Sequence, residues 1–248
     1  MRPAHARLPD GPVLAALDAA AAAQNLTNAG GRPLRFIPQA ELPAGVAYEA
    51  HIGATGRVPT RENLHDFFNA LVWLTFPRIK RQLNALQAAQ IARDGVGKSR
   101  GPARDAATIF DENAALLVVA DDANGRALAE SLRAHDWRQA LVARRADFGP
   151  RAQVWTFGHA LMEKLVHPRK AITAHVRVAY ADSGFFAAPF DARREWIDTV
   201  VAEELKAQEL TTSAFTPLPV LGVPGWWEDQ DAAFYADATV FRPKRRES

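Results

Sequence analysis

The sequence has no cysteine in its 248 residues. This absence excludes a disulfide framework, a thiolate metal site, an iron–sulfur cluster and a cysteine nucleophile. Long apolar runs are also missing, since none approaches the roughly 20 residues that a membrane-spanning helix needs. Asp18 falls inside the alanine-rich stretch near the N-terminus, where a signal peptide would need an unbroken apolar segment. The sequence therefore predicts a soluble, cytoplasmic protein without a membrane partner.

An excess of charge of either sign is lacking too. Lys and Arg total 30 against 28 Asp and Glu, which gives a net charge of +2. So small an excess gives no strong signal for nucleic-acid binding. The 48% apolar content is typical of a globular protein, and neither a repeat nor a low-complexity linker divides the chain. We therefore predict a single domain over residues 1–248, and the sequence leaves its oligomeric state open.

Hydrophobic periodicity predicts an α+β fold that is mainly α-helical with a few short strands. Helices are expected over 12–23, 60–76, 78–93, 126–135, 137–145 and 158–166, and after Asp191 as N-cap, with one or two helical turns over 103–109. Strands are expected over 34–37, 46–52, 114–120, 153–157 and 171–180. Residues 217–243 are rich in proline and aromatic side chains and show little periodicity. Because this segment is too apolar to be left exposed, we expect it to wrap over the body as an extended, irregular piece.

Several stretches resemble one known family. They are 58–74 (VPTRENLHDFFNALVWL) with Phe76-Pro77 and Lys80, 100–106 with 110–113, 157–163, and 218–226. Together they are similar to a bacterial domain of unknown function, DUF3025, over about residues 30–243. The resemblance implies one bacterial structural unit and carries no activity with it.

The helix expected over 60–76 carries a polar cluster. On a helical wheel, Leu64, Phe67, Phe68, Leu71 and Leu74 share the main apolar side, and Glu62, His65, Asp66 and Asn69 lie opposite. Imidazole, carboxylate and amide groups at the edge of a core can form a preorganised site, so His65, Asp66 and Asn69 are candidate catalytic residues. In the structural alternative, His65 and Asn69 cap loop backbone, and Asp66 pairs with Arg61 or Arg104.

Candidate metal ligands lie further along the chain. Asp111 and Glu112 directly precede the strand expected over 114–120, and neighbouring carboxylates can hold Mg²⁺ or Mn²⁺ through oxygen. His159 and Glu163 are spaced to face the same way on a helix, which makes His159 a third candidate ligand. The alternatives are a turn at 111–113 and a surface hydrogen-bonded pair at 159 and 163.

Arg100 and Arg104 flank a Gly-Pro turn, where two guanidinium groups could clamp an anion. Salt bridges to Asp66, Asp111 or Glu112 explain them equally well.

Two functions follow from these candidates. The first is metal-assisted hydrolysis of a phosphate-containing or other anionic small molecule, with a divalent metal on Asp111, Glu112 and His159 and the anion on the two arginines. The second is a non-catalytic binding or scaffold protein, whose polar cluster is a buried structural network and whose Trp226-Trp227 region supplies a partner surface.

Overall fold

The computed structural model describes residues 11–95 and 102–244. In chain order the helices and strands are α1 (Pro12–Ala23), β1 (Arg35–Pro38), α2 (Tyr48–Thr55), β2 (Arg57–Thr60), α3 (Leu64–Thr75), α4 (Pro77–Asp94), α5 (Pro102–Asn113), β3 (Ala114–Ala120), α6 (Ala123–Arg133), β4 (Ala152–Thr156), α7 (His159–Leu165), β5 (Thr173–Ala181), α8 (Ser183–Ala187), α9 (Phe190–Ala207), β6 (Thr216–Pro219) and α10 (Ala232–Ala236). The predicted class, α+β and mainly helical, is confirmed. No described helix is long and apolar enough to cross a membrane.

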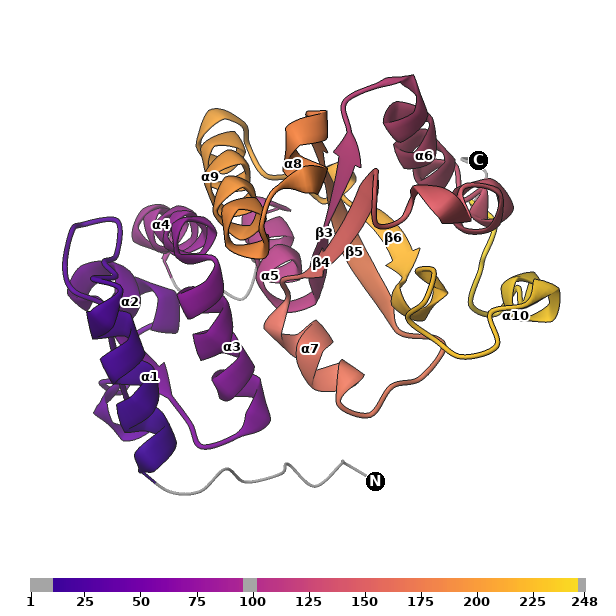
Figure 1. Ribbon diagram of the computed structural model, residues 1–248. Helices are drawn as coiled ribbons and strands as arrows, with labels where there is room; N and C mark the ends of the chain where they lie inside the picture. The colour runs from indigo at the N-terminus through magenta and orange to yellow at the C-terminus, as the bar shows by residue number, and fades with distance from the viewer. Residues whose placement is uncertain (1–10, 96–101, 245–248) are drawn as a thin grey trace.

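A four-stranded sheet with the order β4-β3-β5-β6 forms the centre of the larger part of the molecule (Figure 1). β3 pairs antiparallel with β4 and parallel with β5, and β6 adds antiparallel to β5. All seven residues of β3 are buried, as its unbroken apolar sequence AALLVVA requires of a strand covered on both faces.

Helices cover both faces of this sheet. On one face Leu117 and Val119 join a core cluster with Leu128 of α6 and with Trp137 and Phe234. On the other face Leu116 and Val118 join a cluster with residues of α4, α5 and α9, including Ile79, Phe110, Ile197 and Val201.

The N-terminal elements form a second group, to the left in Figure 1. β1 and β2 pair in parallel, and Leu17, Phe36, Ile52 and Trp73 belong to a third core cluster there. α3 ends at Thr75, and Phe76 is both its C-cap and the N-cap of α4, which starts at Pro77 because proline is tolerated in the first turn of a helix.

Three sequence predictions about elements are wrong. Residues 46–52 are not a strand, because α2 begins at Tyr48. The helix ends at Gly56, which has a left-handed φ of 74°. A Cβ atom at this position would lie 2.4 Å from the Pro33 carbonyl oxygen, so only glycine fits there. Asn63, not Thr60, caps α3 by accepting a hydrogen bond from the Asp66 amide, and Thr60 ends β2 instead. α5 runs on through Asn113, so 111–113 is its last turn rather than a loop before β3.

Smaller differences concern other helix ends and the tail. Residues 138–143 form a π-helix within the predicted 137–145 helix, and Pro189 rather than Asp191 occupies the N-cap of α9. The tail does pack on the body, with Val220, Phe234 and Phe241 in the first core cluster. It is more regular than expected, since it contributes the edge strand β6 and the short helix α10.

Candidate functional site

A pocket of about 570 Å³, called the central pocket below, is lined by residues of α2, α3, α4, α5 and α7. Seven of the eight predicted site residues line it: His65, Asp66, Asn69, Arg104, Asp111, Glu112 and His159. The eighth, Arg100, lies outside the described residues. Groups more than ninety positions apart in sequence meet here because α3 packs against α7 (Figure 1).

Two imidazole rings are in direct contact at the pocket wall. Nε2 of His65 lies 3.1 Å from Nε2 of His159, with the rings edge to face at a centroid distance of 4.5 Å. Nδ1 of His65 lies 2.9 Å from Oε2 of Glu163, and Nδ1 of His159 lies 3.8 Å from Oδ2 of Asp111. The histidine pair, His65 and His159, thus has a carboxylate at each outer end.

The hydrogen bonds fix the tautomers of the neutral pair. A carboxylate accepts only, so His65 donates from Nδ1 to Glu163 and accepts at Nε2 from His159. His159 then carries its proton on Nε2, and its Nδ1 is a bare acceptor with no hydrogen-bond partner among the described residues. His159 is 6% exposed, and burial lowers its pKa to about 4, against the opposing effect of Asp111. It is therefore neutral near pH 7.

Asp111 is held by a buried lysine that the sequence analysis had not assigned to the site. Nζ of Lys80, which is 4% exposed, donates to Oδ1 of Asp111 at 2.5 Å and to Oδ1 of Asn69 at 2.8 Å. Asn69 in turn donates from Nδ2 to the Tyr48 hydroxyl. Burial by itself would raise the pKa of Asp111, but Lys80 and the two histidines bring it below its usual value.

The pocket also contains groups that favour their neutral forms. Burial raises the pKa of the Tyr48 hydroxyl well above its usual value, and it raises the pKa of Glu49 against the effect of Lys80. Glu49 accepts a hydrogen bond at 2.6 Å from the Asn84 amide. Titratable groups with displaced pKa values thus gather around one concave site, which is a recognised mark of functional sites.

Asp66 has the structural role that the alternative interpretation gave it. Its carboxylate accepts from the Arg61 amide at 2.6 Å and from Nε and Nη2 of the same arginine at 3.0 and 2.9 Å. The other half of that alternative is wrong for the described residues, where His65 and Asn69 bond to side chains and not to loop backbone. The side of α3 that carries Asp66 and Asn69 continues with Val72 and Trp73 and is the more deeply buried one, whereas the side with Phe67 and Leu71 is half-buried.

His159 and Glu163 share a face of α7 as predicted, but they are not a surface pair. Each contacts His65 across the interface between α7 and α3. The close packing of α7 against α5 depends on Gly158. A Cβ atom at this position would lie 2.4 Å from the Glu112 carbonyl oxygen and 2.5 Å from the Asn113 nitrogen. The bare glycine lets the start of α7 lie against the end of α5, which brings His159 to Asp111.

The donor set does not fit the predicted divalent metal. The ammonium group of Lys80 already occupies one carboxylate oxygen of Asp111. Within residues 11–95 and 102–244, no group of three or more His, Asp or Glu side chains is placed to hold a metal ion. The ammonium group of Lys80 thus binds the carboxylate that was expected to bind the metal ion.

Arg104 remains a candidate for binding an anion. It lines the pocket, its Nε is buried without a hydrogen-bond partner, and it forms no ion pair with the described part of the chain. The sequence analysis missed several residues of the site, and the three with titratable side chains are Tyr48 and Glu49, which line the pocket, and Lys80, which holds Asp111. For Lys80 the available signal was a lysine between the apolar positions Ile79 and Leu83 of α4.

A family model described as a protein of unknown function (DUF3025) matches residues 34–245. No curated protein and no solved structure matches the chain.

Proposed function

We propose a function from the central pocket, since the chain belongs to the DUF3025 family, whose description assigns no activity. The protein binds a small anionic molecule in this pocket and hydrolyses it by acid–base catalysis. The observation that carries the proposal is the bare Nδ1 of His159. It is buried and lies 3.8 Å from Oδ2 of Asp111, so that two acceptors lie close together behind the pocket wall. A water molecule that lies beside both atoms, within hydrogen-bond distance of each, would have both of its hydrogens accepted.

The histidine pair then offers a path for the proton that such a water must lose. His159 accepts it at Nδ1 and passes its own Nε2 proton to Nε2 of His65, along the 3.1 Å contact. The positive charge ends on His65, next to the carboxylate of Glu163 at 2.9 Å. His159 is neutral before and after this transfer, as its low pKa requires, and the same proton is returned to the leaving group by the reverse route.

The remaining groups have supporting roles. Lys80 keeps Asp111 ionised and fixes its orientation through Oδ1, which leaves Oδ2 for the water. Arg104 supplies the cation for the anionic part of the substrate, for which a guanidinium is well suited. No step in this scheme uses a metal ion.

The experiment is a screen of phosphate esters, nucleotides and carboxylate-bearing esters with the wild-type chain and two matched variants. His159→Gln removes Nδ1 but keeps an amide near the position of Nε2, and His167→Gln changes an exposed histidine outside the pocket. We expect turnover of at least one anionic substrate that falls at least about 100-fold in His159→Gln and is unchanged in His167→Gln and after dialysis against a chelator. Equal turnover in the two variants, or activity that returns only with Mg²⁺ or Mn²⁺, would contradict the scheme.

The scaffold alternative keeps one specific observation in its favour. Asp66 is paired with Arg61, and Lys80 donates to both Asp111 and Asn69, as in a structural network. Chemical denaturation of His159→Gln separates the two functions. A stability equal to or above that of the wild type favours a catalytic role, because active-site groups are often held at a cost in stability. A loss of several kcal/mol without any turnover in the wild type favours the scaffold.

A further inference from the structure

Two tryptophans of the C-terminal tail are exposed although its other aromatic side chains are buried. Trp226 and Trp227 are each 37% exposed, whereas Phe234, Tyr235 and Phe241 are below 9%. Their loop, residues 221–231, is tied from within by Gln230, which accepts from the Gly225 amide at 2.9 Å and donates to the carbonyls of Leu221 and Val223 at 2.7 and 2.8 Å. These hydrogen bonds hold the loop in a conformation that leaves the two indoles at the surface. Their exposure differs from the expectation that the whole tail is buried and agrees with the partner surface of the scaffold interpretation.

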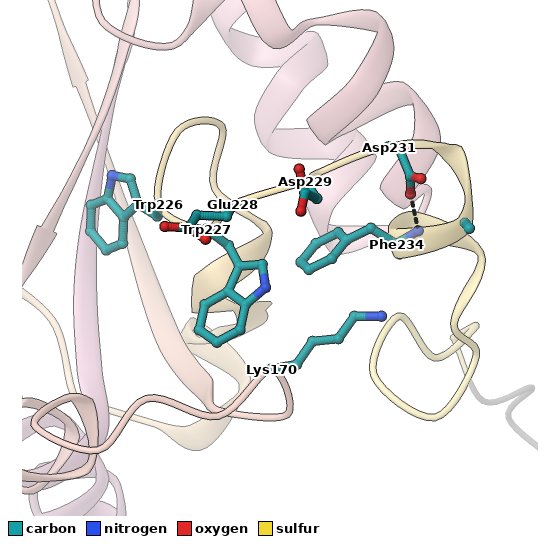
Figure 2. Close-up of a pocket in the computed structure, with 8 residues that line it drawn as sticks. Lys170, Trp226, Trp227, Glu228, Asp229, Asp231 and Phe234 are labelled. Atoms are coloured by element: carbon teal, nitrogen blue, oxygen red, sulfur yellow. Dashed lines mark hydrogen bonds between the residues drawn. The ribbon is translucent and has the colours of Figure 1, made fainter.

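One side of this loop borders a pocket of about 760 Å³ (Figure 2). Trp227 and Phe234 supply aromatic rings to its lining, and Glu228 and Asp229 supply carboxylates. Lys170 is already neutralised, since its ammonium pairs with Asp237 at 2.8 Å and lies 4.5 Å from the Phe234 ring centre. Glu228 and Asp229 form no side-chain hydrogen bond or ion pair with any described residue. Aromatic faces beside unpaired carboxylates are complementary to a cation.

On its other side the loop borders a second hollow of about 450 Å³, which also has Trp226 in its lining. Trp155 and Phe190 stack there at a centroid distance of 5.0 Å, and Phe190 is 58% exposed. Val223 and Pro224 add apolar groups to a lining that also includes Gln153 and Arg193. Trp226 lines both hollows, so the loop presents exposed indoles to each of them, and Phe190 adds a third exposed aromatic ring. Exposed aromatic side chains that gather in this way are typical of a contact surface.

The same hollow follows the free edge of the sheet. β4 is an edge strand of the sheet. The Phe157 amide donates to the Ala114 carbonyl and the Ala120 amide donates to the Arg151 carbonyl, which shows which residues of β4 are hydrogen-bonded to β3. By the alternation of an antiparallel pair, the backbone groups of Val154 and Thr156 then point away from β3. They make no backbone hydrogen bond with another described element. Unpaired strand edges of this kind are templates for an added strand.

We propose that this surface is the docking site for an extended segment of another protein, which pairs with the outer edge of β4, places an apolar side chain between Trp155 and Trp226, and places an arginine or lysine beside Trp227, Glu228 and Asp229. The unpaired carboxylates favour a basic residue in the partner. The free edge of β4 favours an extended polypeptide, because a small cation would bind the carboxylates and leave both the edge and the hollow beside Trp155 unused. The inference is independent of the reaction proposed for the central pocket.

The probe is a fluorescein-labelled peptide of alternating threonine and leucine with one arginine, made in two versions with the arginine near either end. Matched peptides carry glutamate in place of arginine, or N-methyl groups on alternate amides. We expect one arginine peptide to bind the full chain at least about tenfold more tightly than its glutamate counterpart, and the N-methylated peptide to bind weakly because it cannot pair with β4.

Variants of the protein complete the test. Glu228→Gln with Asp229→Asn should abolish the preference for arginine, Trp227→Ala should weaken binding of the arginine peptide, and Glu209→Gln, an exposed carboxylate at the end of α9, should change nothing. Equal binding of the arginine and glutamate peptides, or no binding of either arginine peptide, would overturn the proposal. So would sedimentation showing a dimer of the chain that Trp226→Ala dissociates, since the face would then be a contact between copies.

Discussion

The pair formed by Lys80 and Asp111 allows a quantitative test of how the central pocket is held. Both side chains are buried, at 4% and 7% exposure, and their 2.5 Å contact is the shortest ion pair of the site. Removing one partner of such a pair leaves an uncompensated buried charge, which costs about 3–5 kcal/mol. We therefore expect Lys80→Met, which keeps the unbranched aliphatic part of the side chain and removes its charged end, to lower the free energy of unfolding by this amount at pH 7.

The difference in stability between the wild type and Lys80→Met should also depend on pH in a definite direction. In the wild type the pKa of Asp111 is lowered, so its contribution to stability is present above the unfolded pKa of about 3.9 and is lost as the pH falls below it. Without Lys80, burial dominates and raises that pKa, so the unpaired carboxyl takes up a proton in the folded state at a higher pH. The difference in stability between wild type and Lys80→Met should therefore shrink as the pH falls from 7 toward 4.

The assay is urea denaturation followed by tryptophan fluorescence at pH 7, 5.5 and 4, with the single variants Lys80→Met and Asp111→Leu and the double variant. Because an apolar pair of similar volume can replace a buried ion pair at little cost, the double variant should be within about 1–2 kcal/mol of the wild type. A loss below 1 kcal/mol in Lys80→Met, or a double variant as unstable as the sum of the singles, would refute the reasoning.

The other predictions concern single features of the site and the core. His159→Gln should remove acid sensitivity: the folded pKa of about 4 lies below the usual 6.5, so the wild type loses up to about 3 kcal/mol relative to this variant between pH 6.5 and 4, as denaturation at both values would show. Gly158→Ala should force α7 away from α5 and lower the melting temperature, and an unchanged melting curve would contradict the close approach there. Trp73→Ala should cost about 3–5 kcal/mol as a large core aromatic, and a loss below 1 kcal/mol would remove α3 from the core. Truncation after Thr216 should give insoluble or molten protein, because it removes core side chains and most of β6, whereas a monomer that melts like the full chain would show that the tail is an appendage.

The elements that sequence reasoning predicted well are those with an unbroken local pattern. β3 is a buried apolar run, and α4 and α9 repeat apolar positions over many turns. The segment at 46–52 was misassigned because short apolar runs are ambiguous, and its helical form depends on a partner elsewhere. The Asn28 amide donates to the carbonyls of Ile52 and Gly53, each at 2.9 Å.

The same distinction applies to the site. Polar residues on an otherwise apolar helix identified His65, Asp66 and Asn69, and these do line the pocket. The pairing that decides their chemistry was not accessible from the sequence, because Lys80 looks like any lysine of an amphipathic helix until Asp111 is packed against it. The metal hypothesis did not fit for this reason: spacing shows which donors can share a face, and says nothing about a cation that the fold itself supplies.

The position of Asp198 in α9 suggests an order of folding for the molecule. Its buried carboxylate accepts hydrogen bonds from the Arg78 and Ile79 amides, and so caps the start of α4 from a position about 120 residues later in the chain. During synthesis, α4 leaves the ribosome long before this cap exists, and its first turn, which ends in Lys80, is left without it. Contacts of such long range form late in folding. The pocket should accordingly be among the last parts of the molecule to become native, and a nascent chain released before α9 should lack it.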